Sequence, residues 1–156
     1  MSTIINETIN PIYQIEAIKM NNDGQIKGVE APLPQFYNFF LILVGAPGSG
    51  KTTWMLNLIN KKSKHTFYKK FDRVYIFSNS LHTISTKIKL PDDRMFNGID
   101  DIENVVNELK QNDFKTLIIL DDVISDIKSN DFFKSLIYNR RHIGGGISII
   151  SVSYTH

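Results

Sequence analysis

One short stretch constrains what this chain can fold into more than any other. Residues 45–52 read Gly-Ala-Pro-Gly-Ser-Gly-Lys-Thr, which places two glycines, a lysine and a threonine at the spacing of a phosphate-binding loop. Such a loop turns successive backbone N–H groups toward one anion, and glycine permits the tight turn that this needs. We therefore expect this loop to bind the phosphates of a nucleotide. The expected binding residues are Gly45, Ala46, Pro47, Gly48, Ser49, Gly50, Lys51, Thr52 and Thr53.

The residues on either side of the loop have the pattern that this motif requires. An unbroken apolar run at 39–44 predicts a buried strand before the loop, and apolar pairs at 54–55 and 58–59 predict a helix after it. In that setting Lys51 is expected to reach the β- and γ-phosphates and Thr52 to bind Mg²⁺. The alternative, a glycine-rich turn that binds nothing, does not account for these flanks.

The composition admits one globular domain and excludes several kinds of site. The chain has 156 residues, of which 42% are hydrophobic, and no cysteine, so disulfides, thiolate zinc sites and cysteine nucleophiles are excluded. A formal net charge of +2 permits nucleic-acid binding without arguing for it. Because no apolar run reaches the roughly 20 residues of a membrane helix, and the N-terminus has no basic signal region, we expect a soluble protein that is neither secreted nor inserted into a membrane.

The rest of the chain predicts an alternation of strands and helices, hence an α/β fold. Further strands are expected at 73–78, 117–120 and 147–153, and helices at 100–112 and 131–141, the first of them opened by a capping box of Asp100 and Glu103. Residues 79–98 are ambiguous. Residues 1–36 are turn-rich, with one candidate strand at 12–18, and are interpreted as an N-terminal extension. Residues 37–156 form the predicted nucleotide-binding core.

Two acidic residues directly follow the apolar run at 117–120. In a P-loop enzyme, a carboxylate at the end of a buried strand holds the water shell of Mg²⁺, so Asp121 is the predicted metal partner beside Thr52. Asp122 points to another side of the strand end and is predicted to activate the attacking water as a general base. The alternative, an exposed cap and turn, would be preferred if the phosphate-binding loop were absent.

Two basic clusters each allow two interpretations. The run at 61–70 mixes lysines with Phe67 and Tyr68, so it could contact a nucleic acid, or it could be a solvated helix end whose lysines complement the helix dipole. The pattern alone favours the second, because charge runs are usually solvated faces. Residues 140–142 read Arg-Arg-His and are either surface charge or a sensor of the γ-phosphate, with Arg141 as the catalytic candidate, offered to a neighbouring subunit.

Taken in order, these motifs resemble the FtsK/HerA-type genome-packaging ATPases of large DNA viruses and virophages, the poxvirus-type virion packaging ATPase among them. The likeness covers residue 36 to the end and depends on the loop, the strand at 73–78, the sequence Ile-Ile-Leu-Asp-Asp at 118–122, and Asn-Arg-Arg-His at 139–142. It implies a RecA-like (ASCE) P-loop NTPase with three α/β/α layers. It also implies a mainly parallel sheet in which the four predicted strands have the order 1-4-3-2. The family continues into a fifth strand that this sequence lacks, so we expect the P-loop strand at a sheet edge.

The resemblance implies a motor subunit that hydrolyses ATP with Mg²⁺ and packages viral double-stranded DNA into capsids. Its expected partners are double-stranded DNA, further copies of the chain in a ring, and capsid or other virion proteins, in the host-cell cytoplasm (viral factory) or the virion. Two alternatives remain open. One is a P-loop kinase of a nucleotide or small metabolite, against which the second acid argues. The other is a hydrolysis-deficient nucleotide-binding fragment, since Ser153 or Tyr154 stands where the family commonly has a glutamine.

Overall fold

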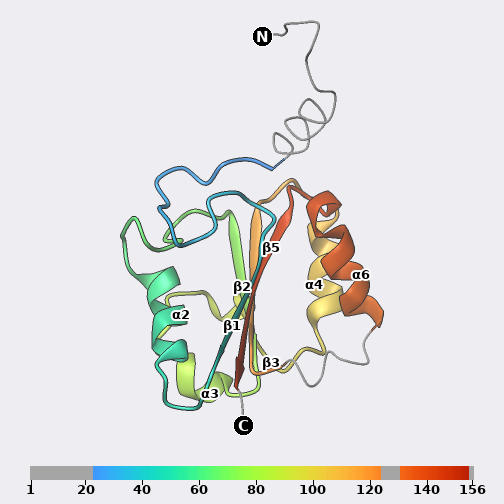
Figure 1. The fold of residues 1–156 in the computed structure, drawn as a ribbon. Coiled ribbons are helices and arrows are strands. Elements are labelled where there is room, and N and C mark those ends of the chain that lie inside the picture. The colour runs from blue at the N-terminus through green and yellow to red at the C-terminus, as the bar shows by residue number, and fades with distance from the viewer. Residues whose placement is uncertain (1–22, 124–130, 155–156) are drawn as a thin grey trace, which may run out of the picture.

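Apolar segments far apart in the sequence form one parallel sheet. The structure is a computed structural model that describes residues 23–123 and 131–154. Its strands are β1 (Phe40–Gly45), β2 (Arg73–Ser78), β3 (Met95–Asn97), β4 (Thr116–Asp121) and β5 (Ile147–Tyr154). They lie in the order β1-β5-β4-β2-β3, and every neighbouring pair is parallel (Figure 1). This confirms the predicted α/β class with a parallel sheet.

The strand order differs from the expected one in a single detail. The four predicted strands are β1, β2, β4 and β5, and they occur in the expected order, with β5 between β1 and β4. The sheet has a further strand, β3, which pairs with the outer side of β2 from Met95 to Asn97. Only three residues long, β3 is too short to show an alternation in sequence, which is why residues 79–98 remained ambiguous.

Helices cover both faces of the sheet, as a three-layer α/β/α fold requires. Helices α2 (Lys51–Asn60) and α3 (Leu81–Ile84) lie on one face, whereas α4 (Ile102–Leu109) and α6 (Asp131–Asn139) lie on the other (Figure 1). Met55, Leu58 and Ile84 are buried in the first layer with Ile76 and Ile119 of the sheet. In the second layer the buried stripe consists of Val105, Val106, Leu109, Phe133 and Leu136, packed on Ile118, Leu120 and Ile149.

Two helices are shorter than their sequence patterns predict. The expected helix at 100–112 is α4, whose N-cap is Asp101 and makes no side-chain capping hydrogen bond, so the predicted capping box at Asp100 does not form. The expected helix at 131–141 ends as α6 at Asn139 and continues as the 3-10 helix η3 (Arg140–His142). A second short 3-10 helix, η2 (Asp92–Arg94), precedes β3.

Burial falls from the centre of the sheet to the strand before the phosphate loop. All six residues of β4 are buried, whereas in β1 Ile42 and Val44 are 53% and 58% exposed. In the described part of the chain β1 pairs only with β5, so the P-loop strand stands at a sheet edge, as expected. Leu41 and Leu43 of the same strand pack beneath α2.

The part of the expected N-terminal extension that the structure describes packs on the core. Ile26, Val29 and Leu33 are buried with the residues of α2, and Gln25 forms an antiparallel bridge with Phe36. The candidate strand at 12–18 lies outside the described residues. Among the helices that are described, none is both long enough and apolar enough to cross a membrane.

Candidate functional site

The carboxyl ends of β1, β2 and β4 lie at the same end of the sheet, which we call the carboxyl edge. The register pairs Asp121 of β4 with Ser78 of β2 on one side and with Val152 of β5 on the other. Strand β5 in turn pairs with β1, whose last residue, Gly45, begins the phosphate loop. Two strand spacings separate β4 from β1, about 10 Å in all. The loop, Ser78 and the acid pair therefore share one edge, where parallel α/β sheets bind their ligands.

The phosphate loop has the backbone conformation that an anion cradle needs. Gly48 and Gly50 have φ values of 80° and 88°, in the left-handed region that favours glycine. Gly50 is the N-cap of α2, and the first turn of that helix contains no acidic residue. The loop residues from Gly48 to Thr53 line a hollow of about 230 Å³. The positive end of the α2 dipole is thus directed into a cradle lined by backbone N–H groups.

The Lys51 ammonium lies inside the curve of this loop. It donates hydrogen bonds to the carbonyl oxygen of Gly45, to the carbonyl oxygen of Ala46 at 3.0 Å, and to the Ser49 hydroxyl at 3.1 Å. A Cβ atom on Gly45 would lie 2.9 Å from the Ser49 hydroxyl and 3.2 Å from the Lys51 ammonium. Glycine at position 45 therefore lets the lysine curl back over the start of the loop.

Asp121 is a buried carboxylate held on one side only. It is 3% exposed, and the Ser78 hydroxyl donates a 2.8 Å hydrogen bond to its Oδ2 atom. Its Oδ1 atom has no hydrogen-bond partner among the described residues. Burial raises the pKa of Asp121, the Ser78 hydrogen bond opposes that shift, and the negative charge of Asp122 adds to it. A desolvated carboxylate with one unused oxygen is suited to a cation.

Asp122 differs from its neighbour in exposure and in backbone conformation. It is exposed, and its φ of 56° lies in the left-handed region, which aspartate tolerates better than most residues. Its backbone N–H donates to the carbonyl oxygen of Val152 at 3.0 Å, and its own carbonyl oxygen accepts a 2.8 Å hydrogen bond from the Asn79 side chain. The turn is thus held from both neighbouring strands and directs the second acid toward solvent.

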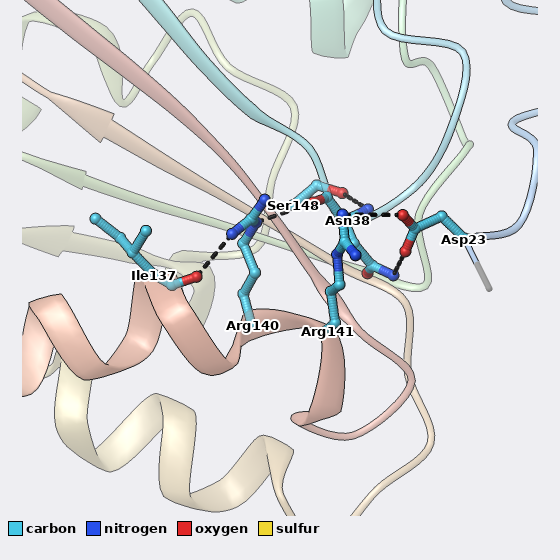
Figure 2. A network of polar contacts seen from close by, with 6 residues as sticks. All are labelled: Asp23, Asn38, Ile137, Arg140, Arg141 and Ser148. Carbon is cyan, nitrogen blue, oxygen red and sulfur yellow. Dashed lines mark hydrogen bonds and ion pairs between the residues drawn. The ribbon is translucent and has the colours of Figure 1, made fainter. Parts of the chain in front are cut away.

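Arg141 lies at the amino ends of the strands, at the opposite end of the sheet from the phosphate loop. We call this end the amino edge. Arg140 and Arg141 precede β5 and lie near Asn38, which comes just before β1 (Figure 2). Arg140 donates from Nε to the Asn38 carbonyl oxygen at 2.9 Å, and Arg141 forms a 3.2 Å ion pair with Asp23. The length of a six-residue strand, about 20 Å, separates this edge from the loop. The structure therefore does not bring Arg141 to the other predicted site residues of the same chain.

Sequence reasoning missed two residues of this site, Ser78 and Asn79. Ser78 ends β2 and is the direct register partner of Asp121, and Asn79 follows it and donates from its side chain to the Asp122 carbonyl oxygen. The signal was present, because a polar residue ending a predicted parallel strand falls at the same edge as the phosphate loop. It went unused although the strand order that the resemblance implies already places β2 beside β4.

The donor set at this edge suits Mg²⁺ better than a metal bound wholly by protein. The described residues contain no group of three or more His, Cys, Asp or Glu side chains that could hold a metal ion. Mg²⁺ needs no such group, because it keeps several waters and takes one or two protein oxygens together with phosphate oxygens. The unpartnered Oδ1 of Asp121 is an oxygen of that kind.

Comparison with known protein families identifies the family of this chain. The family model of the poxvirus A32 protein matches residues 34–156, a span that includes the phosphate loop, the acid pair and the basic residues before β5. No curated protein matches the chain. The match covers well over half of the sequence, and the family is that of the viral genome-packaging ATPases. The chain therefore belongs to the poxvirus A32 protein family.

Proposed function

We propose that this chain is the motor subunit that hydrolyses ATP with Mg²⁺ and drives viral double-stranded DNA into capsids. The observation that carries the proposal is the meeting, at one sheet edge, of a phosphate loop with a buried carboxylate whose Oδ1 is unpartnered. A family of packaging ATPases requires a site for ATP hydrolysis. A phosphate loop and a carboxylate that can hold a metal are parts of such a site.

The phosphate loop binds and orients ATP. Backbone N–H groups from Gly48 to Thr53 surround the phosphates, and Lys51 moves from the Gly45 and Ala46 carbonyl oxygens onto the β- and γ-phosphates. Thr52 and Asp121 would hold Mg²⁺, which when bound neutralises charge that develops on the phosphate oxygens. Binding at this edge is mostly positioning, because phosphoryl transfer asks little covalent chemistry of the protein.

The end of β2 prepares the acids for their two roles. Ser78 is a positioning residue, since its hydroxyl holds Oδ2 of Asp121 and leaves Oδ1 for the metal shell. Asp122 is exposed and accepts a proton from the attacking water, while Asn79 holds the backbone of its turn. One acid is thus buried for a cation and the other solvated for proton transfer.

Arg141 acts, in this proposal, on a neighbouring copy of the chain. It is half exposed at the edge far from its own phosphate loop, so it meets a γ-phosphate only across a subunit boundary. A ring of copies satisfies this requirement, and its turnover depends on assembly. The RecA-like, FtsK/HerA-type arrangement, capsid or virion partners, and work in the viral factory or virion belong to the same proposal.

The test is ATP hydrolysis by the full chain with and without a DNA duplex. We expect hydrolysis that requires Mg²⁺ and rises with DNA, and a loss of at least about 100-fold in Lys51→Ala, because the lysine stabilises transition-state charge. Lys134→Ala, at an exposed position of α6, is the matched control and keeps full activity. Unchanged hydrolysis in Lys51→Ala would refute the site. Phosphate transfer to a nucleoside monophosphate, without DNA stimulation, would favour the kinase alternative.

A further inference from the structure

A second hollow, distinct from the phosphate loop, lies beyond the other end of α2. It has a volume of about 690 Å³ and is lined by Gly28, Lys62, Ser63, Lys64, Tyr68, Lys69 and Lys70, which we call the lysine hollow. It is larger than the hollow of about 230 Å³ over the phosphate loop. None of its lining residues is acidic.

The lysines that line the hollow lie beyond Lys61, the C-cap residue of α2. Helix α2 ends at Asn60, and its last turn contains no basic residue. Its final carbonyl groups accept backbone hydrogen bonds instead, from Lys61 N–H to Asn57 at 3.1 Å and from Phe67 N–H to Leu58 at 2.8 Å. The interpretation that the sequence pattern favoured, a solvated helix end whose lysines complement the dipole, stays a prediction, and the lysines of the hollow follow that helix end.

The loop that carries the lysines is anchored from below by its other residues. Phe67 is 2% exposed and stacks on Phe39 with ring centroids 5.2 Å apart. The buried Thr66 donates from its hydroxyl to the carbonyl oxygens of Lys61 and Ser63, at 2.5 and 3.2 Å. Since these anchors fix the backbone, the exposed lysines project from defined positions, which lowers the ordering cost of binding.

The N-terminal segment forms the other wall of the lysine hollow. Lys70 donates from its ammonium to the Lys27 carbonyl oxygen at 2.7 Å, and Glu30 N–H donates to the Lys64 carbonyl oxygen at 2.8 Å. Gly28 has φ 81°, and a Cβ atom there would lie 2.9 Å from the Lys70 ammonium. Glycine thus allows the two walls to approach each other closely.

The positive charge gathered here is poorly compensated within the chain. Among the described residues, the ion pair formed by these lysines is that of Lys64 with Glu30, at 3.7 Å between two well-exposed side chains. Lys69 instead lies over the Tyr68 ring, 5.4 Å from its centroid. Like charges held together repel one another, and an anion from outside the chain relieves that repulsion.

We propose that the lysine hollow binds the phosphate backbone of double-stranded DNA. The inference rests on the proposed function, and it assigns the DNA contact to residues 62–70 and the segment at 27–28. Lysine ammonium groups suit phosphate contacts that carry no sequence information, and the lining has no arginine, asparagine or glutamine to read base edges. A surface of this kind holds a genome of any sequence.

The duplex fits this surface better than a single strand. Single-strand sites depend on aromatic rings as platforms for successive bases, whereas the lysine hollow has one ring, Tyr68, which is half-buried and lies beside Lys69. The phosphate loop stands at the far end of α2, a helix of ten residues and about 15 Å. DNA at the lysine hollow therefore leaves the nucleotide site open, and one rigid helix connects the two.

The test compares two triple variants of the full chain that change the net charge equally. One is Lys62→Glu/Lys64→Glu/Lys69→Glu in the lysine hollow, and the other is Lys87→Glu/Lys110→Glu/Lys134→Glu at exposed positions elsewhere. Binding of a labelled duplex of arbitrary sequence is measured without nucleotide over a series of salt concentrations. We expect the first variant to bind at least about 30-fold more weakly and the salt slope to fall by about 0.9 for each lost phosphate contact. The second should stay within about threefold of the parent chain.

The outcomes separate this inference from the proposed function. If the parent chain binds the duplex and both variants bind it equally, the inference is overturned while the packaging function stands. If the parent chain hydrolyses ATP yet binds no duplex, the packaging function fails with it. Equally tight binding to phosphatidylserine vesicles through the same lysines would also overturn the assignment to DNA. ATP binding by each variant verifies that it is folded. If the triple variant in the lysine hollow does not bind ATP, the single variant Lys62→Gln must still lower the slope of duplex binding against salt.

Discussion

The carboxyl edge and the amino edge of this one sheet present different kinds of polar group. At the carboxyl edge the groups offered to phosphate are backbone N–H groups, set by glycine conformations at positions 48 and 50, and a buried carboxylate stands beside them as a candidate metal partner. At the amino edge the corresponding groups are long, exposed side chains on a loop. Protein backbone groups and buried acids keep one fixed arrangement, which suits a single ligand. Lysine side chains can adjust to the phosphate backbone of a DNA of any sequence. This difference matches the two proposed roles, a hydrolysis site at the carboxyl edge and a DNA-binding surface at the amino edge.

The edges also differ in what they cost the fold. Asp121 is desolvated, and its unpartnered oxygen is a local loss of stability that a bound cation or a proton removes. The lysines at the other edge remain hydrated, so their cost is mutual repulsion that salt screens. Substitutions at the carboxyl edge should therefore trade stability against turnover, and those at the amino edge should change binding and its salt dependence.

The largest effect is expected from replacing the second acid, Asp122. Asp122→Asn should lower the turnover number about 100- to 1,000-fold, because a general base contributes about that much, and should leave ATP binding near that of the parent chain. Rapid-quench hydrolysis and ATP titration measure the two effects. Because Asp122 is exposed, its replacement should not unfold the chain. An unchanged turnover number would remove Asp122 from the mechanism.

A smaller effect is expected at the end of β2. Ser78→Ala removes the hydrogen bond to Oδ2 of Asp121, so we expect turnover to fall about tenfold, as about 1.4 kcal/mol of lost orientation implies. The apparent affinity for Mg²⁺ should fall with it, and Ser78→Thr should restore most of both. A serine that only fills space would lose stability in the alanine variant without any change in Mg²⁺ dependence. Metal titrations of steady-state hydrolysis distinguish the two.

Asp121 itself links the carboxyl edge to stability. Burial raises its pKa above 3.8, so the native chain holds the proton more tightly than the unfolded chain. The contribution to stability is present below the unfolded pKa and is lost as pH rises through the folded one. Asp121→Asn escapes that loss and should raise Tm at neutral pH by about 2–4 °C, while removing hydrolysis. Calorimetry without nucleotide at a series of pH values checks this, and a gap in Tm that fails to widen with rising pH contradicts it.

The smallest effect is expected for the ion pair at the amino edge. The Arg141 side chain is 51% exposed and that of Asp23 is 17% exposed, so Arg141→Ala should cost under about 1 kcal/mol in urea unfolding. ATP binding by an unassembled chain should not change. Asp23→Asn is the control, since it removes the same ion pair and keeps the arginine. If Arg141 acts across subunits, only Arg141→Ala should lower the hydrolysis of the assembled form.

Most of the candidate site was predictable because its signals are local. The loop at 45–52 carries its own conformation in its glycines, and the acids at 121–122 stand directly after a run of residues that are all buried. The apolar runs likewise predicted four of the strands. Helix ends were less accurate, because the end of α6 depends on tertiary contacts such as that of Arg140 with Asn38. Strand β3 was missed because its pairing with β2, more than its sequence, makes it a strand.

What the sequence by itself determined is thus the chemistry of single segments: a phosphate loop, a strand ending in two acids, and a lysine-rich run. The resemblance already implied the strand order, and the tertiary structure decided which individual side chains of these strands meet. Strand pairing placed Ser78 against Asp121, and the same pairing carried Arg141 to the far edge. Helix α2 ends at Asn60 with Lys61 as its C-cap, and the tertiary structure sets the lysines that follow around a hollow. The physical reason is that side-chain type and local backbone preference are properties of neighbours in the chain, whereas register and burial are properties of neighbours in space.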